Sequence, residues 1–488
     1  MSAEQLMMLT LVLPLLGGVG VMITGRFPNL RETVTLITAS ATAVLVVMIA
    51  MRFLEGETFL YSFGEVVPGI AIAFKIEASG MIFALVAGLL WIVTSIYAIG
   101  YMRGHNEQNQ TRFFTAFAVA ISCAFGIAFS ANLFTLFLFY ELLTLSTYPL
   151  VAHSGTAEAK QGGRIYLGLL LGTSIGLLLL AIIVTWLVAG TVDFQEGGIL
   201  AGKLDPAWAG LLYALFLFGI GKAALMPFHR WLPAAMVAPT PVSALLHAVA
   251  VVKAGVFTLF KVTSQIFGSA YILSNDVTGI LVWAAAATIL LASLIAMTKD
   301  NLKARLAYST VSQLSYIAMG SMLASKTALI GAAMHIAMHA FSKITLFFAA
   351  GAIFVASHKK LVSELDGLGR AMPITFGAFL IGSLSIIGMP FFGGFWSKLY
   401  LAISTLESGQ LLLLGVLMVS TLLNTAYLLP IPIRAFFATP SSGEQHSEIK
   451  EAPKTILLAM VITSIACIVL FFHPDPLYRL ASLAAGGL

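Results

Sequence analysis

Long apolar runs follow one another along almost the whole chain, and they constrain its fold more than any other feature of the sequence. A membrane-spanning helix needs about 20 largely apolar residues. Runs of this kind, bounded by Gly, Pro or charged residues, lie at about 5–24, 33–53, 78–101, 112–130, 132–152, 162–190, 207–238, 240–265, 278–297, 301–322, 326–356, 372–405, 411–437 and 454–472. The sequence therefore predicts an all-α polytopic membrane protein with about fourteen spans.

The composition leaves little room for a soluble domain. Of 488 residues, 59% are hydrophobic and 10% are charged, and the mean hydropathy is +0.98, beyond what a water-soluble fold can bury. The first run lacks a basic leading segment and a small-residue cleavage site, so we expect a retained span. The alternating stretch from Thr58 to Ile76 contains Gly64, Pro68 and Gly69, which predicts a small extramembrane β-hairpin.

Basic residues predict the orientation of the chain. They gather in the loops that follow odd-numbered spans, whereas the loops after even-numbered spans carry few and mix them with glutamates. The basic residues of the odd loops are Arg26, Arg31, Arg103, Arg112, Lys160, Arg164, Lys299, Lys303, Arg305, Lys359, Lys360, Arg370, Arg434, Lys450 and Lys454. By the positive-inside rule these loops are cytoplasmic, which predicts a multi-pass protein of the inner (plasma) membrane with both termini facing outward.

Two runs are too long for one upright helix and are interrupted in a similar way. Pro227 and Pro233 interrupt the seventh run, and Pro390, with Gly393 and Gly394, interrupts the twelfth. Proline removes a backbone donor, which lipid tolerates only where protein or water satisfies the freed groups. Broken helices five spans apart predict two inverted five-helix repeats, an arrangement that places transport sites at the breaks. The alternative is that Pro and Gly are simply common in membrane helices.

These signals divide the chain into four parts. We expect N-terminal helices with the hairpin at 1–111, a first repeat at 112–265, a second repeat at 278–437 and a C-terminal helix at 438–488.

Ionisable residues stand where a membrane span should be apolar. Glu141, Lys222 and Lys253 lie near the middle of their runs, and Lys343 and Lys398 extend the series. Each such group costs about 2.5–3.5 kcal/mol on insertion scales, so pairing or a wet cavity is expected. We predict that Glu141 pairs with Lys222, and that breaking this pair sends a proton toward Lys253 and then Lys398. Static ion pairs that hold helices together are the alternative.

Three histidines join this buried series. His335 and His339 are four residues apart on one helix face, and Lys343 continues the stripe. A neutral imidazole exchanges protons near physiological pH, so we expect both histidines to act in a proton relay. His247 precedes Lys253 by six residues and is a further relay candidate. Structural hydrogen bonding is the alternative for each, while a metal site needs further Cys, Asp or Glu ligands.

No cofactor, metal or nucleic-acid chemistry is predicted. The segment GIGKAA around Lys222 lacks the first Gly and the Ser/Thr of a P-loop, and no GxGxxG follows a strand. Cys123 and Cys467 lie alone in apolar runs, and no haem or iron–sulfur ligand pattern is present. Any redox reaction must therefore belong to partner proteins. The net charge of +5 comes from scattered basic residues, which indicate topology rather than nucleic acid.

Three segments carry a resemblance to a known family. They are GKAALMPFHRWLPAAMVAPTPVSALLHAVAVVKAGVF from Gly221, KDNLKARLAYSTVSQLSYIAMG from Lys299 and HAFSKITLFFAAG from His339. The chain resembles the antiporter-like subunits shared by Mrp-type Na⁺/H⁺ antiporters, the proton-pumping arm of respiratory complex I and membrane-bound hydrogenases. This resemblance implies outward termini, inverted five-helix repeats and broken seventh and twelfth helices.

The resemblance also implies roles for single residues. The matching positions are Glu141 and Lys222 for the glutamate–lysine pair, Lys253 for the bridging lysine, Lys398 for the twelfth helix, and His335, His339 and Lys343 for the eleventh. Where the family often has WLPD, this chain has WLPAAM, so that acid is absent here. The length resembles most that of the D-type component of Mrp antiporters, and it is also similar to that of the shorter complex I and hydrogenase subunits.

Together these observations predict a proton-translocating subunit of a multisubunit Mrp-type antiporter. Its partners are other membrane subunits and lipids, with Na⁺ handled by this chain or by a neighbour. The alternative is a pumping subunit of a complex I-type or membrane-bound hydrogenase assembly, in which partners carry the redox chemistry. A membrane scaffold with purely structural charges also stays open. An organic-solute transporter fits less well, because its site would need substrate-recognition groups.

Overall fold

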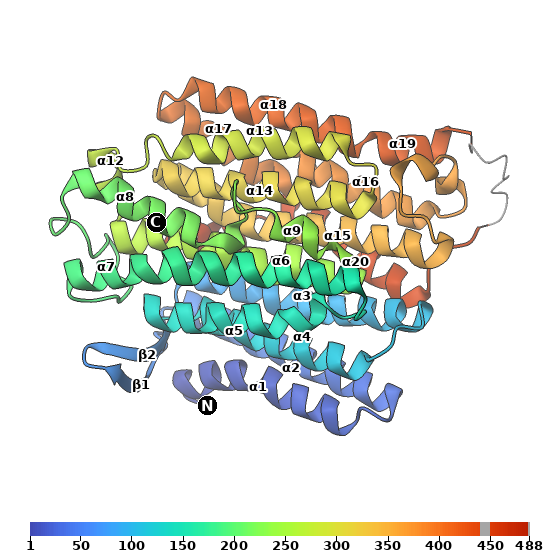
Figure 1. Cartoon of the computed structure of the whole chain (residues 1–488), viewed down its shortest axis with the longest axis horizontal. Coiled ribbons are helices and arrows are strands. Elements are labelled where there is room, and N and C mark those ends of the chain that lie inside the picture. The colour runs from blue at the N-terminus through green and yellow to red at the C-terminus, as the bar shows by residue number, and fades with distance from the viewer. Residues whose placement is uncertain (440–448, 487–488) are drawn as a thin grey trace.

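The computed structural model of the chain describes residues 1–439 and 449–486. Its helices lie roughly parallel in one bundle, with α1 and α18 at opposite edges of the view (Figure 1). Among the described residues, ten helices are long and apolar enough to cross a membrane. Three shorter apolar helices and the more polar α14 complete the fourteen predicted spans. The prediction of an all-α polytopic membrane protein is therefore confirmed.

The unbroken spans follow the predicted runs closely. They are α1 (Ala3–Ile23), α2 (Pro28–Leu54), α3 (Ala78–Gly104), α4 (Gln110–Ala128), α5 (Leu133–Val151), α13 (Val282–Thr298), α14 (Leu302–Leu323), α15 (Lys326–Ser357) and α20 (Lys454–Phe472). The sixth span joins α6 (Ala157–Thr173), the π-helix η1 (Ser174–Leu178) and α7 (Leu179–Ala189). The thirteenth joins α18 (Leu411–Leu428) and α19 (Pro430–Phe437). Shorter elements are α12 (Ser269–Asn275), η6 (Val362–Glu364), η7 (Leu368–Arg370) and α21 (Asp475–Ala484).

The predicted hairpin is confirmed and marks one end of the bundle. Strands β1 (Leu60–Val67) and β2 (Ile70–Lys75) pair antiparallel, with Leu60 opposite Lys75. The Asn132 side chain caps the start of α5 and also donates to the Ala71 carbonyl at 2.8 Å, which ties the hairpin to the bundle. Both chain ends lie at the same end of the bundle as the hairpin (Figure 1). Which end faces outward stays a prediction.

The two predicted helix breaks are present. In the seventh span, α8 (Pro206–Gly219) is followed by η2 (Gly221–Ala223), α9 (Trp231–Ala234) and η3 (Ala235–Val237). In the twelfth, α16 (Pro373–Ile387) and α17 (Gly394–Glu407) are separated at Gly388, whose φ of 90° lies in the left-handed region. The freed Gly221 carbonyl accepts a hydrogen bond from the Trp231 indole at 2.9 Å. The inverted relation between the two five-helix sets stays a prediction.

A third irregularity, which the sequence pattern does not predict, lies in the eighth span. This span consists of α10 (Thr240–Ala244), the π-helix η4 (Leu245–Val249), α11 (Val251–Lys261) and the π-helix η5 (Val262–Phe267). The apolar window of this span is entirely buried inside the bundle. Single π-turns inside membrane helices are frequently found at functional sites, and η4 contains His247.

The centre of the bundle is built from this eighth span and α15. The long helix α15 packs against α3, α14, α16, α17 and α20. On α11, Gly255 lets the backbone of Lys222 approach, because a Cβ at this position would overlap the Lys222 carbonyl group and the Ala223 nitrogen. The broken seventh span therefore lies directly against the eighth.

Gly255→Ala should disturb this close approach. The added methyl group would displace η2, and overpacking of this kind typically costs about 1–3 kcal/mol. We expect a lower melting temperature of the purified protein in detergent, measured by tryptophan fluorescence. The matched control is Gly168→Ala on α6, where a Cβ would meet nothing within 4 Å. Equal melting temperatures for the two variants would contradict the direct packing of η2 on α11.

Candidate functional site

Lys222 lies in the break of the seventh span and is held by α5. Its side chain is fully buried, and its Nζ donates to the Tyr140 carbonyl at 2.8 Å and to the Thr144 hydroxyl at 2.5 Å. The ammonium also lies 3.3 Å from the centre of the Tyr140 ring, a cation–π arrangement. The Lys222 amide donates to the Tyr140 hydroxyl at 3.0 Å. Tyr140 and Thr144 therefore provide the polar environment that a buried ammonium needs.

The predicted ion pair between Glu141 and Lys222 is not formed in this structure. Among the described residues, no basic group lies within ion-pair distance of Glu141, and both carboxylate oxygens lack a hydrogen-bond partner. Neighbouring helix positions point about 100° apart, so a lysine that packs on Tyr140 lies to one side of Glu141. Glu141 is half-buried beside the exposed Leu142. Glu141 and Lys222 are therefore close enough for their charges to interact but are not in direct contact in this structure.

Lys253 and His339 form the central contact of the site. Lys253, from α11, places Nζ 2.6 Å from Nδ1 of His339, from α15. Both side chains are almost completely buried, and no carboxylate pairs with either of them among the described residues. One proton can therefore be shared between the two nitrogens, with the direction set by the tautomer and charge of the imidazole.

A line of contacts leads from His339 to the second helix break. The rings of His339 and His335 lie 5.9 Å apart between centres. His335 contacts the Ser397 hydroxyl at 2.8 Å through Nδ1 and the Gln313 amide oxygen at 3.2 Å through Nε2. It also stacks on Tyr316, with 5.9 Å between ring centres. The predicted helix-face stripe of histidines is thus connected by polar and aromatic contacts to α17 and α14.

Lys398 ends this line at the break of the twelfth span. Its Nζ donates to the Ile387 carbonyl at 3.2 Å, which the end of α16 leaves free. The ammonium also lies 4.8 Å from the centre of the Tyr316 ring. The residue as a whole is partly exposed at the edge of the chain. The carbonyl group freed at the break therefore solvates the Lys398 ammonium.

Lys343 does not take part in the line of contacts from His339 to Lys398, but contacts a separate pair of hydroxyl groups. Its buried Nζ donates to the Ser309 hydroxyl at 2.7 Å, and Ser309 in turn accepts from the Tyr427 hydroxyl at 3.0 Å. These contacts link α15 to α14 and α18. Ser309 and Tyr427 were missed because hydroxyl groups in a membrane helix carry no signal until their facing helix is known.

A row of unpartnered polar groups lies along the eighth span. Among the described residues, the Ser243 hydroxyl, both ring nitrogens of His247 and Nε2 of His339 are buried without a hydrogen-bond partner. Thr240, Ser243 and His247 recur at a spacing that places them on one side of the helix. Buried polar groups are almost always paired with protein or ordered water, so this row marks a place for water.

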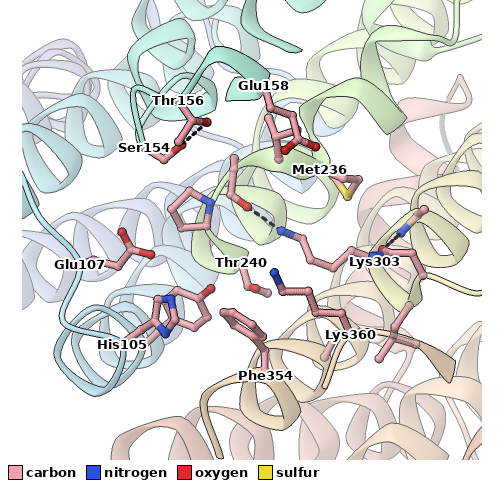
Figure 2. Close-up of a pocket in the computed structure, with 18 of the residues that line it drawn as sticks. His105, Glu107, Ser154, Thr156, Glu158, Met236, Thr240, Lys303, Phe354 and Lys360 are labelled. Carbon is pink, nitrogen blue, oxygen red and sulfur yellow. Dashed lines mark hydrogen bonds between the residues drawn. The ribbon is translucent and has the colours of Figure 1, made fainter. Parts of the chain in front are cut away.

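This row begins at a cavity of 450 Å³. Figure 2 shows Lys303 and Lys360 pointing into it on one side, with His105 and Glu107 on the other and Thr240 between them. Lys303 donates to the Ala238 carbonyl at 2.5 Å. The lining segments are the loops that follow α3, α5, α13 and α15, which are predicted to be cytoplasmic, and the connection from α9 to α10. Lys303 entered the sequence-based predictions only as a topology signal, and the cavity was missed because five separate segments build it.

Burial in this cavity shifts the titration of Glu107. Burial raises the pKa of the Glu107 carboxyl above its usual 4.5, although His105 and Lys303 act in the opposite direction. A carboxyl group of this kind takes up a proton at a higher pH than a free glutamate does.

Comparison with known proteins identifies the family. The sequence signature of the transmembrane family described as NADH:quinone oxidoreductase/Mrp antiporter matches residues 130–424, more than half of the 488 residues. The chain belongs to this family. The matched range includes the relay candidates from Glu141 to Lys398, so this antiporter-like subunit carries its buried charges within the family domain.

Individual relatives come from two kinds of assembly. The NADH-quinone oxidoreductase subunit N of Desulforudis audaxviator is 31% identical over 451 residues, covering 88% of this chain and 89% of the relative. The NAD(P)H-quinone oxidoreductase chain 5 of Synechocystis is 32% identical over 424 residues, and the match spans 60% of that longer protein. The A/B component of a probable K(+)/H(+) antiporter of Rhizobium meliloti is 33% identical over 342 residues, covering 68% of this chain and 33% of the relative.

Solved structures share the whole fold. A chain of the Mrp complex from Dietzia sp. matches with a TM-score of 0.87 at 24% identity, covering 99% of this chain and 97% of that chain. A chain of the membrane-bound sulfane sulfur reductase, an archaeal respiratory membrane complex, matches with a TM-score of 0.87 at 23% identity and the same coverage. The antiporter-like subunit therefore has a multi-pass fold found in both an antiporter and a respiratory complex.

Thr144→Val should weaken the position of Lys222 in this subunit. The substitution keeps the shape of the side chain but removes an oxygen that accepts from the ammonium, and such a bond is worth about 1.5–3 kcal/mol. We expect a lower melting temperature than in the control Thr185→Val, whose buried hydroxyl bonds only to the Ala181 carbonyl of its own helix. Equal losses in both variants would contradict the role of Thr144 as a partner of Lys222.

Glu107→Gln should change the pH dependence of stability. In the wild type, the folded state holds the Glu107 proton more tightly than the unfolded state, so stability is lost as pH rises from 4.5 through the raised pKa. The amide does not titrate, so the variant should lose less stability over this range. Melting temperatures measured between about pH 4 and pH 7 provide the test. Identical pH slopes would show that burial of Glu107 has no energetic consequence.

Proposed function

We propose that this chain is the proton-translocating subunit of a multisubunit Mrp-type cation/proton antiporter, and that its buried lysines and histidines relay protons along the middle of the membrane. The observation that carries the proposal is the 2.6 Å contact between Lys253 and His339. It joins two titratable groups from different helices without a carboxylate beside them. A purely structural contact would pair opposite charges, whereas two basic groups in contact are suited to share one proton.

The relay extends from this contact in two directions. Toward one edge it passes through His335 to Lys398, by the ring and hydroxyl contacts described above. Toward the other it reaches Lys222, whose backbone packs on α11 at Gly255. No side-chain bond joins Lys222 to Lys253 among the described residues, so ordered water is expected to carry the proton over this step.

Glu141 controls the proton on Lys222 in this proposal. With Lys222 held by Tyr140 and Thr144, the carboxylate is unpaired. A small movement of the lysine side chain toward Glu141 would form the ion pair and favour the charged ammonium. Alternation between these two positions is a switch of a few kcal/mol that conformational change in the assembly can drive.

The cavity of Figure 2 is the proposed cytoplasmic inlet of this relay. The unpartnered Ser243 and His247 provide hydrogen-bonding positions for water between the cavity and the Lys253–His339 contact. Basic loops on this side of the bundle support a cytoplasmic assignment, with the termini outward and the protein in the plasma membrane.

The edges of the relay are the proposed contacts with neighbouring membrane subunits. Glu141 on α5 and Lys398 on α17 are both only partly buried by this chain, and these helices are well separated in Figure 1. A partly exposed charge at mid-membrane is expensive in lipid, so another membrane protein is expected to cover each edge. In this arrangement Na⁺ passes through this chain or through a neighbour.

A pumping subunit of a complex I-type or membrane-bound hydrogenase assembly is the second candidate. The match over 89% of NADH-quinone oxidoreductase subunit N favours it. The same relay would serve there, driven by redox chemistry in partner subunits. Co-purification of iron–sulfur proteins with this chain would select the second candidate, while a cation-dependent antiport without them would select the first.

Lys222→Ala should abolish proton exchange. Without the ammonium, Glu141 loses the group whose proton it controls, and we expect at least a tenfold lower rate. The measurement is cation-dependent dissipation of a pH gradient in vesicles that contain the complete assembly, at equal expression. The control is Lys326→Ala, because Lys326 is an exposed residue at the start of α15. Unchanged exchange in Lys222→Ala would contradict the relay and leave the chain as a scaffold.

A further inference from the structure

A second buried lysine cluster lies outside the proposed relay. Lys261, at the end of α11, places Nζ 2.8 Å from Oε2 of Glu77, which precedes α3. Gln265 donates to the same carboxylate oxygen at 2.9 Å, and Lys75 from β2 lies 2.9 Å from Oε1. The cluster is at the hairpin end of the bundle, opposite the cavity of Figure 2. Sequence reasoning missed Lys261 and assigned Glu77 to a loop.

The cluster connects the interior of the bundle to its surface. The side chain of Lys261 is 1% exposed, that of Glu77 is 11% exposed and that of Lys75 is 45% exposed. The Lys261 ammonium also donates to the Ser130 carbonyl at 3.1 Å and lies 3.7 Å from the centre of the Phe194 ring. Charged groups therefore lead stepwise from a fully enclosed position to water.

Glu77 keeps its negative charge at neutral pH. Burial alone would raise the pKa of the Glu77 carboxyl, but the ammonium groups of Lys261 and Lys75 lower it to about 2. Lys75 and Lys261 are the titratable groups that act on this carboxyl. Glu77 is consequently a fixed negative charge, and Lys261 is the member of the pair that can exchange a proton.

Lys261 is aligned with the central contact of the relay. Lys253, Phe257 and Lys261 follow one another at four-residue spacing on α11, so Lys261 lies about 12 Å farther along the helix than Lys253. The Lys261 ammonium is 5.8 Å from the centre of the Phe257 ring, and Phe257 packs on Phe83 of α3 at 5.4 Å. Two aromatic rings therefore stand between the relay and the cluster.

We propose that Lys261, held by Glu77, is the outward proton-release station of this subunit, and that Phe83 and Phe257 form the apolar barrier between it and Lys253. The inference rests on the proposed function, because it assigns an outlet to the same relay. In each turnover, the Lys261 ammonium gives one proton to water beside Lys75 and its neutral amine then receives one from the Lys253 side. Only N–H bonds are broken and formed, and Glu77 stays ionised throughout.

The competing explanation of the same contacts is a structural strut, an ion pair whose role is only to hold two helices together. An ion pair between the start of α3 and the end of α11 also fixes these two helices, and removal of one partner would leave a buried charge uncompensated. The two accounts differ in one respect. A strut needs a permanent positive charge at position 261, whereas a release station needs a charge that can be given up.

Lys261→Arg separates these accounts, because a guanidinium keeps the positive charge but does not release its proton in proteins. We expect at least a tenfold loss of exchange in vesicles that contain the complete assembly, with the melting temperature of the assembly preserved. The matched control is Arg52→Lys at the neighbouring surface ion pair of Arg52 with Glu57, which should exchange at the wild-type rate. Wild-type exchange by Lys261→Arg would overturn the proposal.

The double variant Lys261→Met with Glu77→Gln provides a second test of the proposal, which is needed if arginine does not fit at position 261. Removal of both charges leaves no buried charge uncompensated, because Lys75, the other partner of Glu77, is 45% exposed to solvent, and such replacements are often neutral for stability. A release station predicts at least a tenfold loss of exchange here as well, and a strut predicts exchange within twofold of the wild type. If Lys222→Ala abolishes exchange while both position-261 variants retain it, the outlet is refuted and the relay stands. Retained exchange in Lys222→Ala refutes the relay itself.

Discussion

Inside a membrane, every polar group must find its partner within the protein or in enclosed water, and this constraint organises the whole bundle. Lys222 lies at the break of the seventh span and takes the Tyr140 carbonyl and the Thr144 hydroxyl as partners. Lys398 lies just after the break of the twelfth span and takes the Ile387 carbonyl. At the second break the freed carbonyl of Ile387 solvates the ammonium, whereas at the first break the neighbouring helix α5 provides the partners.

The same constraint gives the buried lysines two kinds of surroundings. The pair of Lys261 and Glu77 has a full set of charged and polar partners at the hairpin end. The contact between Lys253 and His339 has no carboxylate beside it, and the side-chain polar atoms of Ser243 and His247 have no hydrogen-bond partner among the described residues. The hairpin end therefore holds a permanent negative charge on Glu77, whereas the centre of the bundle brings two basic groups together without one.

Much of the fold could be predicted from the sequence, because span length, proline position and basic loops each follow directly from the properties of lipid. Most of the buried charges were also evident, since each stands out against an apolar run, but Lys261 was not singled out. The contacts between helices could not be predicted in this way. Glu141 was predicted to pair with Lys222. In the structure the lysine ammonium instead donates to the carbonyl group of Tyr140, the preceding residue on α5. Nothing in the sequence around His247 marks the π-turn, and Glu77, the partner of Lys261, lies outside the predicted spans, where its neighbours could not be inferred.

The most direct test of the relay is the proton flux through Lys253→Met, compared with the wild type in vesicles that contain the complete assembly at equal amounts. Methionine keeps much of the volume of the lysine but cannot share a proton with His339. We predict at least a tenfold loss of proton flux with an intact assembly. Flux within twofold of the wild type would contradict a relay through the Lys253–His339 contact.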